Sequence, residues 1–284
     1  MVAGSSAEPM GGAMQVQLKD RILGLAAVLL LSPLAFAQNV QRANQGAPMN
    51  AVAPNAKPSA PAPKRDITGV WFHNGAGSRT NKPPAMTPWG QAQFATHKTN
   101  GRDLVADSTD PMVKCDPLGF PRNITWENRG TQFIQAPTKT VELFQYQRIW
   151  REIWTDGRAL PKNAGSDAPN APDPRYYGYS VGRWDDDYNF VVDTVGTDSD
   201  TWLDNAGDPH SEQLHVTETY KRVDHDNLEI TLKIDDPKAY TQPFVLGTVN
   251  YTWNPQQEFE EQLCIPSDAQ LYLSTIANPA GGKK

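Results

Sequence analysis

The sequence predicts a mainly β protein, an antiparallel β-barrel with one or two short helices. Three observations lead to this fold class. Short segments of alternating apolar and polar residues recur along the chain, turn signals separate them, and no strand–helix–strand spacing of a parallel α/β fold occurs. We expect one barrel domain over residues 66–274 and a flexible tail over residues 275–284.

The first 37 residues have the organisation of a secretory signal peptide. A charged triplet at 19–21 precedes the apolar run 22–31, and Ala-Phe-Ala at 35–37 matches a cleavage site. Met14 gives such a signal a tidier start than Met1. The alternative is a retained anchor, but the run is shorter than the ~20 apolar residues of a membrane span. We therefore expect a periplasmic or secreted protein with no stable membrane span after cleavage.

The segment 38–65 is rich in proline, alanine, asparagine and glutamine. It has little apolar surface to bury, so we expect a disordered linker. Folded sequence is expected to begin near Asp66.

The chain has two cysteines, Cys115 and Cys264. An even pair in an exported protein favours a disulfide. The alternative, a pair of catalytic or metal-binding thiols, lacks any C-x-x-C spacing. Closing so long a loop would contribute about 5 kcal/mol in the chain-entropy model, before native strain is subtracted.

The elements follow in order along the barrel domain. Thr68–His73 is expected to be the first strand. Thr87–Lys98 is expected to be a helix, with Thr87 as its cap and Pro88 at its first position. Residues 99–130 are loop-rich. The later strands are expected at Thr131–Ala136, Thr140–Gln147, Arg148–Thr155, Tyr179–Asp185, Tyr188–Val195, Leu214–Val223, Leu228–Asp235 and Phe244–Trp253.

The strand Arg148–Thr155 is unusual because neither of its faces is simply apolar. One face carries Trp150, Glu152 and Trp154, which suggests the wall of a polar and aromatic pocket inside the barrel. The alternative is a solvated outer face covered by amphipathic tryptophans. The complete set of expected ligand-binding residues is Trp150, Glu152, Trp154, Arg183, Trp202 and Tyr220.

The segment from Trp202 to Arg222 concentrates histidines and carboxylates. His210 follows the rigid turn Gly-Asp-Pro, and Asp204 is near enough in sequence to orient its ring. An imidazole with a carboxylate partner titrates near neutral pH and can transfer protons. We expect His210 as general acid or base, Asp204 as its orienting group, and Glu218 or Asp156 as the second acid–base group. The alternative is a capped surface turn, with the histidine satisfied by a backbone carbonyl.

Other chemistries are less well supported. The set His210, Glu212, His215 and Glu218 could suggest a metal site, but His215 and Glu218 would point to opposite faces of a regular strand. No nucleophile-elbow or phosphate-loop motif occurs. The net charge of −6 argues against nucleic acid as a partner. We expect no metal and no cofactor, and the sequence leaves the oligomeric state open.

Two functions compete on this reading. The first is an exported enzyme, a metal-independent lyase, isomerase or hydrolase that acts on a small organic substrate in the barrel pocket. The alternative is a non-catalytic periplasmic or secreted barrel that carries a small organic ligand. A carrier has no need of a fixed histidine–carboxylate pair, whereas a proton-transfer enzyme does.

Seven runs of residues in this chain look familiar: DITGVW, TPWGQAQF, CDPLGFPR, REIWTDGRALP, GYSVGRWDDDYNFVVDTVG, TWLDNAGDPHSEQLHVTETYKRVD and IDDPKAYTQPF. Together they resemble a family of secreted hypothetical proteins of acidobacteria and sphingomonads. The resemblance covers residues 66–267 and implies export, but it implies no catalytic residue. Gly69-Val70-Trp71 also resembles the G-x-W of lipocalin-type barrels, which implies an antiparallel barrel of the calycin or lipocalin type.

Overall fold

The structure is a computed structural model that describes residues 59–73, 81–99, 108–125 and 130–282. All of these belong to one compact unit, Asn50–Lys284. The expected signal peptide (1–37) and residues 38–58 of the expected linker lie outside the described residues.

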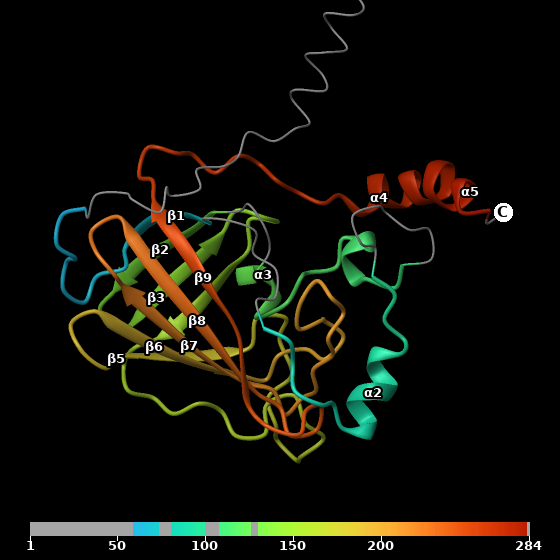
Figure 1. Ribbon diagram of the computed structural model, residues 1–284, viewed down its shortest axis with the longest axis horizontal. Coiled ribbons are helices and arrows are strands. Elements are labelled where there is room, and N and C mark those ends of the chain that lie inside the picture. The colour runs from blue at the N-terminus through green and yellow to red at the C-terminus, as the bar shows by residue number, and fades with distance from the viewer. Residues whose placement is uncertain (1–58, 74–80, 100–107, 126–129, 283–284) are drawn as a thin grey trace, which may run out of the picture. The chain divides into compact units, whose positions relative to one another are not determined.

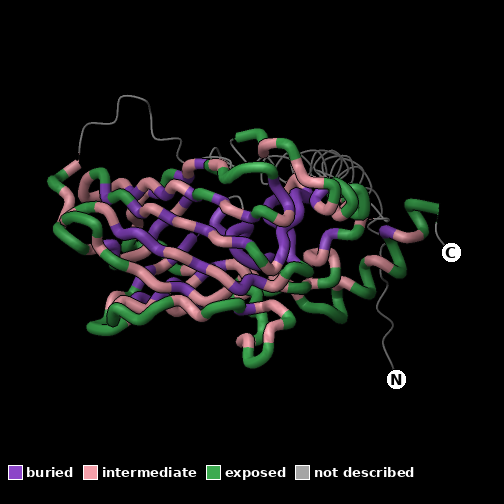
Figure 2. The backbone as a smooth tube through the Cα atoms, turned by 90° about the horizontal axis from the view of Figure 1, so that it is seen from below, coloured by how far each residue is buried: buried purple, intermediate pink, exposed green. Residues whose placement is uncertain are grey.

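Nine strands form a closed barrel in which each strand pairs with the next along the chain and β9 pairs with β1 (Figure 1). The expected mainly β barrel is confirmed. Buried and exposed positions alternate along the strands, as period-two side-chain geometry requires (Figure 2). The strands are β1 (Gly69–His73), β2 (Gly130–Ala136), β3 (Lys139–Phe144), β4 (Trp150–Trp154), β5 (Tyr179–Trp184), β6 (Asn189–Val195), β7 (His215–Arg222), β8 (Asn227–Asp235) and β9 (Phe244–Trp253).

The barrel is mixed rather than wholly antiparallel, because β4 and β5 run parallel and pair only at Ile153–Ser180 and Trp154–Val181. Parallel neighbours start at the same end of a sheet, so the chain must return the length of the barrel between them. Residues 155–178 make this return without a helix of their own. We call them the crossover segment.

The barrel end where β1 begins is closed by Trp71 and Arg222. The indole of Trp71 is fully buried, and its Nε1 donates to the carbonyl of Ile67 at 2.9 Å. The guanidinium of Arg222 lies 4.5 Å from the Trp71 ring centroid and donates to the carbonyls of Asp66 and Asp224 at 2.9 and 3.0 Å. The arginine therefore stabilises the ring and satisfies loop carbonyls at the same place.

Residues 59–65 belong to the folded unit, which corrects the expected linker boundary at Asp66. The amide of His225 donates to the carbonyl of Ala60 at 2.8 Å. The amide of Asp226 donates to the hydroxyl of Ser59 at 3.1 Å. These bonds satisfy the β7–β8 turn, so the last part of the proline-rich segment has ordered backbone partners.

The opposite end of the barrel is filled by the segment that contains the short helix α3 (Arg122–Thr125). Phe120 and Ile124 are fully buried within the core cluster. Tyr251 of β9 donates its hydroxyl to the carbonyl of Ile124 at 3.3 Å. Sequence patterning indicated only a loop here, because four helical residues are too few to show a periodicity.

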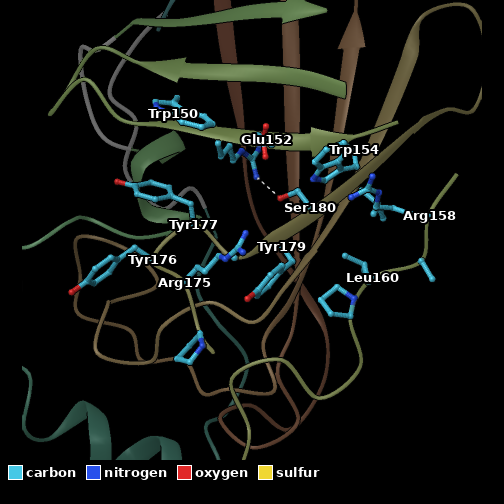
Figure 3. A pocket seen from close by; sticks show the side chains of 16 residues that line it. Trp150, Glu152, Trp154, Arg158, Leu160, Arg175, Tyr176, Tyr177, Tyr179 and Ser180 are labelled. Carbon is cyan, nitrogen blue, oxygen red and sulfur yellow. Dashed lines mark hydrogen bonds between the residues drawn. The ribbon is translucent and has the colours of Figure 1, made fainter. Parts of the chain in front are cut away.

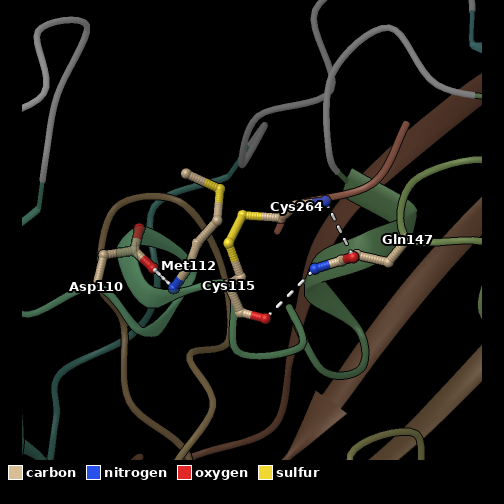
Figure 4. The surroundings of a disulfide bond; sticks show 5 residues. All are labelled: Asp110, Met112, Cys115, Gln147 and Cys264. Carbon is tan, nitrogen blue, oxygen red and sulfur yellow. Dashed lines mark hydrogen bonds between the residues drawn. A yellow bond between two sulfur atoms is a disulfide. The ribbon is translucent and has the colours of Figure 1, made fainter. Parts of the chain in front are cut away.

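The expected disulfide between Cys115 and Cys264 is confirmed (Figure 4). Cys115 follows the 3₁₀ helix η1 (Pro111–Lys114), and Cys264 precedes the C-terminal helices. The side chain of Gln147 bridges the two cysteine backbones, donating to the carbonyl of Cys115 at 3.3 Å and accepting from the amide of Cys264 at 3.2 Å. The bridge thus fixes the chain after β9 to the loop before α3.

Two helical regions differ from expectation at their ends. The helix α2 (Pro88–Phe94) begins as expected, since Gly90 donates its amide to the hydroxyl of Thr87 at 3.1 Å, but it ends before Lys98. At the C-terminus α4 (Pro266–Tyr272), η2 (Leu273–Ala277) and α5 (Asn278–Ala280) continue the helical chain past residue 274, where a flexible tail was expected.

Candidate functional site

The two faces of β4 carry the two charged regions of interest. Arg151 and Ile153 are buried on the inner face, whereas Trp150 is 58% exposed on the outer face. The expectation that Trp150, Glu152 and Trp154 line the barrel interior is therefore corrected, because these side chains point outward. The interior instead accommodates Arg151, which finds its counter-charges there.

Arg151 is the centre of a buried charge cluster, which we define as Glu142, Arg151, Glu218 and Tyr220. Its Nε donates to Glu142 at 2.7 Å, and its Nη1 donates to Glu218 at 3.1 Å. Its Nη2 donates to the other oxygen of Glu218 and to the hydroxyl of Tyr220 at 2.9 Å. All three nitrogens are therefore used, and the guanidinium also lies 4.0 Å from the ring centroid of Phe120.

The carboxylates of the cluster are equally well satisfied. Glu142 accepts from Thr131 at 3.2 Å, and Glu218 accepts from Thr194 at 3.2 Å and from Tyr220. Burial raises the pKa of Glu142 to about 7, although Arg151 opposes the shift. Burial and the neighbouring carboxylates raise the pKa of the Tyr220 phenol well above its ordinary value. The cluster is thus internally paired, as buried charges must be.

A groove of about 700 Å³ lies on the outer side of the same strand pair (Figure 3). One wall is the outward face of β4 and β5, and the other is formed by both ends of the crossover segment. Its size is typical of a small-molecule site, ~300–1,000 Å³. Its floor includes Arg151 and Ser180, which hydrogen-bond at 3.4 Å, so the groove reaches the buried charge cluster. The aromatic lining residues are Trp150, Trp154, Tyr176, Tyr177 and Tyr179.

Most charges of the groove are already paired. Glu152 accepts a hydrogen bond from Lys139, and Arg158 donates to Asp156 at 2.7 Å. The guanidinium of Arg158 also lies 3.5 Å from the ring centroid of Trp154, and the ammonium of Lys139 lies 4.7 Å from it. Trp154 is therefore held between protein cations.

Arg175 and Trp150 differ from these residues because their side chains line the groove without an ion pair or a cation–π contact to a second charged residue in the part of the chain that the structure describes. Among the described residues no ion pair or side-chain hydrogen bond engages the guanidinium of Arg175, which lies 4.0 Å from the ring centroid of Tyr179. Within the described ranges no ring–ring or cation–π contact engages Trp150, whose residue surface is 58% exposed. Such groups can receive a ligand without first breaking an internal contact.

His210 is buried, with 1% of its surface exposed. Its Nε2 lies 2.8 Å from the hydroxyl of Thr201, and its Nδ1 lies 3.3 Å from the carbonyl of Ser211. Burial lowers its pKa. Asp204 accepts the amides of Ala206 and Asp208 at 2.8 and 3.2 Å. Within the described residues no hydrogen bond joins Asp204 to His210, so the expected acid–base pair is not formed.

The other expected site residues are dispersed. Glu218 and Tyr220 belong to the buried charge cluster, and Asp156 pairs with Arg158 at the mouth of the groove. Trp202 is buried and stacks on His97 with ring centroids 4.7 Å apart. Arg183 is exposed on the outer face of β5 and donates to Asp193 at 2.9 Å. The structure therefore brings Trp150, Glu152 and Trp154 together, but not with His210.

The residues considered for a metal site are also apart. Glu212 pairs with Lys238, and His215 lies 3.0 Å from Asp193 on the outer face of β7, opposite to the inward Glu218. In the ranges that the structure describes, no group of three or more histidine, cysteine or acidic side chains is arranged to hold a metal ion.

Sequence reasoning missed Arg175, Tyr176, Tyr177 and Tyr179 as groove residues, and Glu142 and Arg151 as the inner cluster. A signal for the first group is present: the run RYYGY, which leads into β5 and ends on its first residue, is dense in aromatic and cationic side chains. No local signal exists for the second group, because Arg151 reaches Glu218 across 67 positions of sequence.

Comparisons of this chain with protein-family models, with curated proteins and with solved structures found no match. Among the described residues no helix is both long and apolar enough to span a membrane.

Proposed function

We propose that this protein is an exported, non-catalytic barrel that binds a small organic molecule in the groove between β4, β5 and the crossover segment. The observation that carries the proposal is the groove of about 700 Å³ with five aromatic side chains in its lining. Concave aromatic sites with a few fixed polar groups are the usual form of small-molecule pockets. The Cys115–Cys264 disulfide supports export, because such bonds persist in oxidising compartments.

Rigid support of the wall formed by residues 173–179 favours selective binding over loose surface adsorption. The backbone of Arg175 forms a bridge with Thr197, and the amide of Gly178 donates to the carbonyl of Arg175 at 3.0 Å. The hydroxyl of Tyr179 donates to the carbonyl of Asp173 at 2.9 Å. A wall fixed in this way loses little conformational entropy when a ligand binds.

The competing proposal is an acid–base lyase, isomerase or hydrolase. It is less well supported because the candidate base, His210, is buried outside the residues that line the groove. The acidic lining residue, Glu152, is bonded to Lys139. A general base must reach the proton that it removes, directly or through one water. The binding function requires no such group.

The test is a ligand screen of sugars, aromatic acids and terpenoids by thermal shift, followed by calorimetry on each hit. A groove ligand should bind Trp150→Ala about tenfold more weakly, because the exposed indole is the largest free stacking surface of the groove. The matched control is Tyr188→Ala, an exposed aromatic outside the groove, which should leave the affinity unchanged.

Product analysis of each mixture separates the two proposals. A hit that is recovered chemically unchanged supports the binding protein, and one that is converted supports the enzyme. A hit that binds wild type and Trp150→Ala equally well contradicts the groove as the binding site.

A further inference from the structure

We infer that the ligand of this groove is a planar organic anion, with Arg175 binding its carboxylate and Trp150 stacking on its ring. This inference rests on the proposed binding function and adds the chemical class of the ligand. It assigns specificity to a charge on the crossover segment rather than to the barrel interior.

The first argument is the charge balance of the groove. Four charged residues line it: Arg151, Glu152, Arg158 and Arg175. Three of them have counter-charges within 4 Å: Arg151 in the buried charge cluster, Glu152 with Lys139, and Arg158 with Asp156. Only Arg175 has none among the described residues. A ligand carboxylate would form an ion pair with the guanidinium of Arg175.

The second argument is that Arg175 is held in place without its charge being used. Its amide donates to the carbonyl of Gly196 at 3.0 Å, and its carbonyl accepts the amide of Asp198 at 3.0 Å. Its guanidinium stacks on Tyr179, which leaves the edge N–H donors free for a carboxylate. The structure thus fixes the cation before a ligand arrives, and fixed donors recognise an anion at low entropic cost.

The third argument concerns the aromatic surface. In Figure 3 Trp150 and Tyr177 lie toward one end of the groove and Trp154 with Arg158 toward the other, with Arg175 and Tyr179 between them. The cations around Trp154 occupy that indole, whereas Trp150 is open. Trp150 and Arg175 both line the groove, whose volume of about 700 Å³ accommodates a ligand of one or two fused rings.

Other ligand classes fit less well. A cationic ligand would meet Arg175 and would find Glu152 already bonded to Lys139. A neutral ring could stack on Trp150 but would make no use of the guanidinium of Arg175, which stays exposed to solvent. The anion is the class that uses both open groups.

The experiment measures calorimetric affinities of three probes that share a naphthalene ring and differ in charge: 2-naphthoate, its near-isosteric amide 2-naphthamide, and 2-naphthylmethylammonium. Wild type should bind the carboxylate about 10- to 100-fold more tightly than the amide, as expected for a hydrogen bond between charged groups. Arg175→Gln should abolish this preference, and Arg175→Lys should restore part of it. Arg183→Gln, an exposed arginine of β5 outside the groove lining, is the matched control and should change nothing. Added salt should weaken the binding of the carboxylate probe and leave the affinity of the neutral amide unchanged.

Each outcome decides the inference. If the amide and the carboxylate bind equally and Trp150→Ala weakens both, the groove binds ligands but the anion specificity is wrong. If the carboxylate preference survives Arg175→Gln, the assignment to Arg175 is wrong. If wild type binds none of the probes at millimolar concentration, this ligand class is rejected, while Trp150-dependent hits from the broader screen would still support the binding function.

Discussion

The inner and outer sides of the barrel wall at β4 each hold an arginine, Arg151 inside β4 and Arg175 on the crossover segment outside it, and the two differ in their partners. On the inner face Arg151 has two carboxylates, a phenol and an aromatic ring as partners. On the outer side of the same wall Arg175 stacks on one ring and has no counter-charge among the described residues. A buried charge must be fully paired, whereas an exposed charge is solvated by water and needs no internal partner before a ligand binds.

This difference in charge pairing indicates that the groove, rather than the buried charge cluster, is the place where a ligand binds. The buried charge cluster has three carboxylate or phenol partners around one guanidinium, so a ligand would have to displace an internal bond. In the groove, a ligand can contact the guanidinium of Arg175 and the indole of Trp150 without displacing an internal ion pair. The fully paired charges inside the barrel therefore indicate a structural role, and Arg175 outside it, unpaired among the described residues, indicates a site for ligand binding. Three predictions test this contrast.

The largest expected effect is the loss of Arg151. Arg151→Met leaves Glu142 and Glu218 buried without a cation, and breaking a buried pair in this way costs roughly 3–5 kcal/mol. The measurement is the free energy of unfolding from urea titration. Arg175→Gln is the matched control on the other face and should change it by less than about 0.5 kcal/mol. Equal costs for the two variants would refute the contrast between the faces.

The next effect is the pH dependence due to Glu142. Its pKa rises from the ordinary 4.5 to about 7 in the folded state, because of burial. Between these pH values the folded protein holds a proton that the unfolded chain has released. The contribution of Glu142 therefore makes stability fall as pH rises from about 4.5 to about 7, by on the order of 3 kcal/mol, and remain level above that.

Glu142→Gln removes this titration, so its free energy of unfolding relative to wild type should increase from pH 5 to pH 8. Comparing the two proteins cancels the other titrating groups. Parallel pH profiles for the variant and wild type would show that Glu142 does not hold the proton.

The smallest effect on stability is expected at Asp193, which pairs with an arginine near the surface as Glu218 does in the interior. Asp193 accepts from Arg183 at 2.9 Å, from Thr217 at 2.9 Å and from His215 at 3.0 Å. The hydrogen bond from His215 is the main reason that its pKa lies well below the ordinary value. Arg183 is 58% exposed, so solvent screens the cluster, and Asp193→Asn should cost less than about 1 kcal/mol.

Salt sharpens this last comparison. Added salt should reduce the cost of Asp193→Asn, because exposed charges are screened over about 10 Å at 0.1 M ionic strength. The cost of Arg151→Met should hardly change, since its partners are buried. A strong salt dependence at Arg151 would show that water reaches the cluster.

Much of the fold was predictable because its causes are local in sequence. The strand expected at Leu228–Asp235 alternates apolar and polar residues, and its apolar members Leu228, Ile230, Leu232 and Ile234 are all buried. Turn signals predicted the hairpins, and the two cysteines allowed one pairing. The short α3 and the parallel β4–β5 pair were not predictable, because four helical residues show no period and strand direction depends on the partner strand.

The site was harder to predict because its residues are assembled from distant segments. Trp150, Glu152 and Trp154 were identified as a lining group, but the strand could not reveal which face pointed inward. Both faces of β4 mix apolar and polar side chains, so alternation gave no preference. His210 looked accessible in a turn, yet the surrounding loops bury it.

By itself the sequence determined the barrel class, the helix start at Thr87 and the disulfide, since each depends on neighbouring residues or on composition. Only the tertiary structure decided that Arg151 turns inward and Trp150 outward. The physical reason is that Arg151 is stable inside only because Glu218 and Tyr220, 67 and 69 positions away, provide a counter-charge and a hydrogen-bond partner there. The crossover segment then covers the outward face and creates the groove.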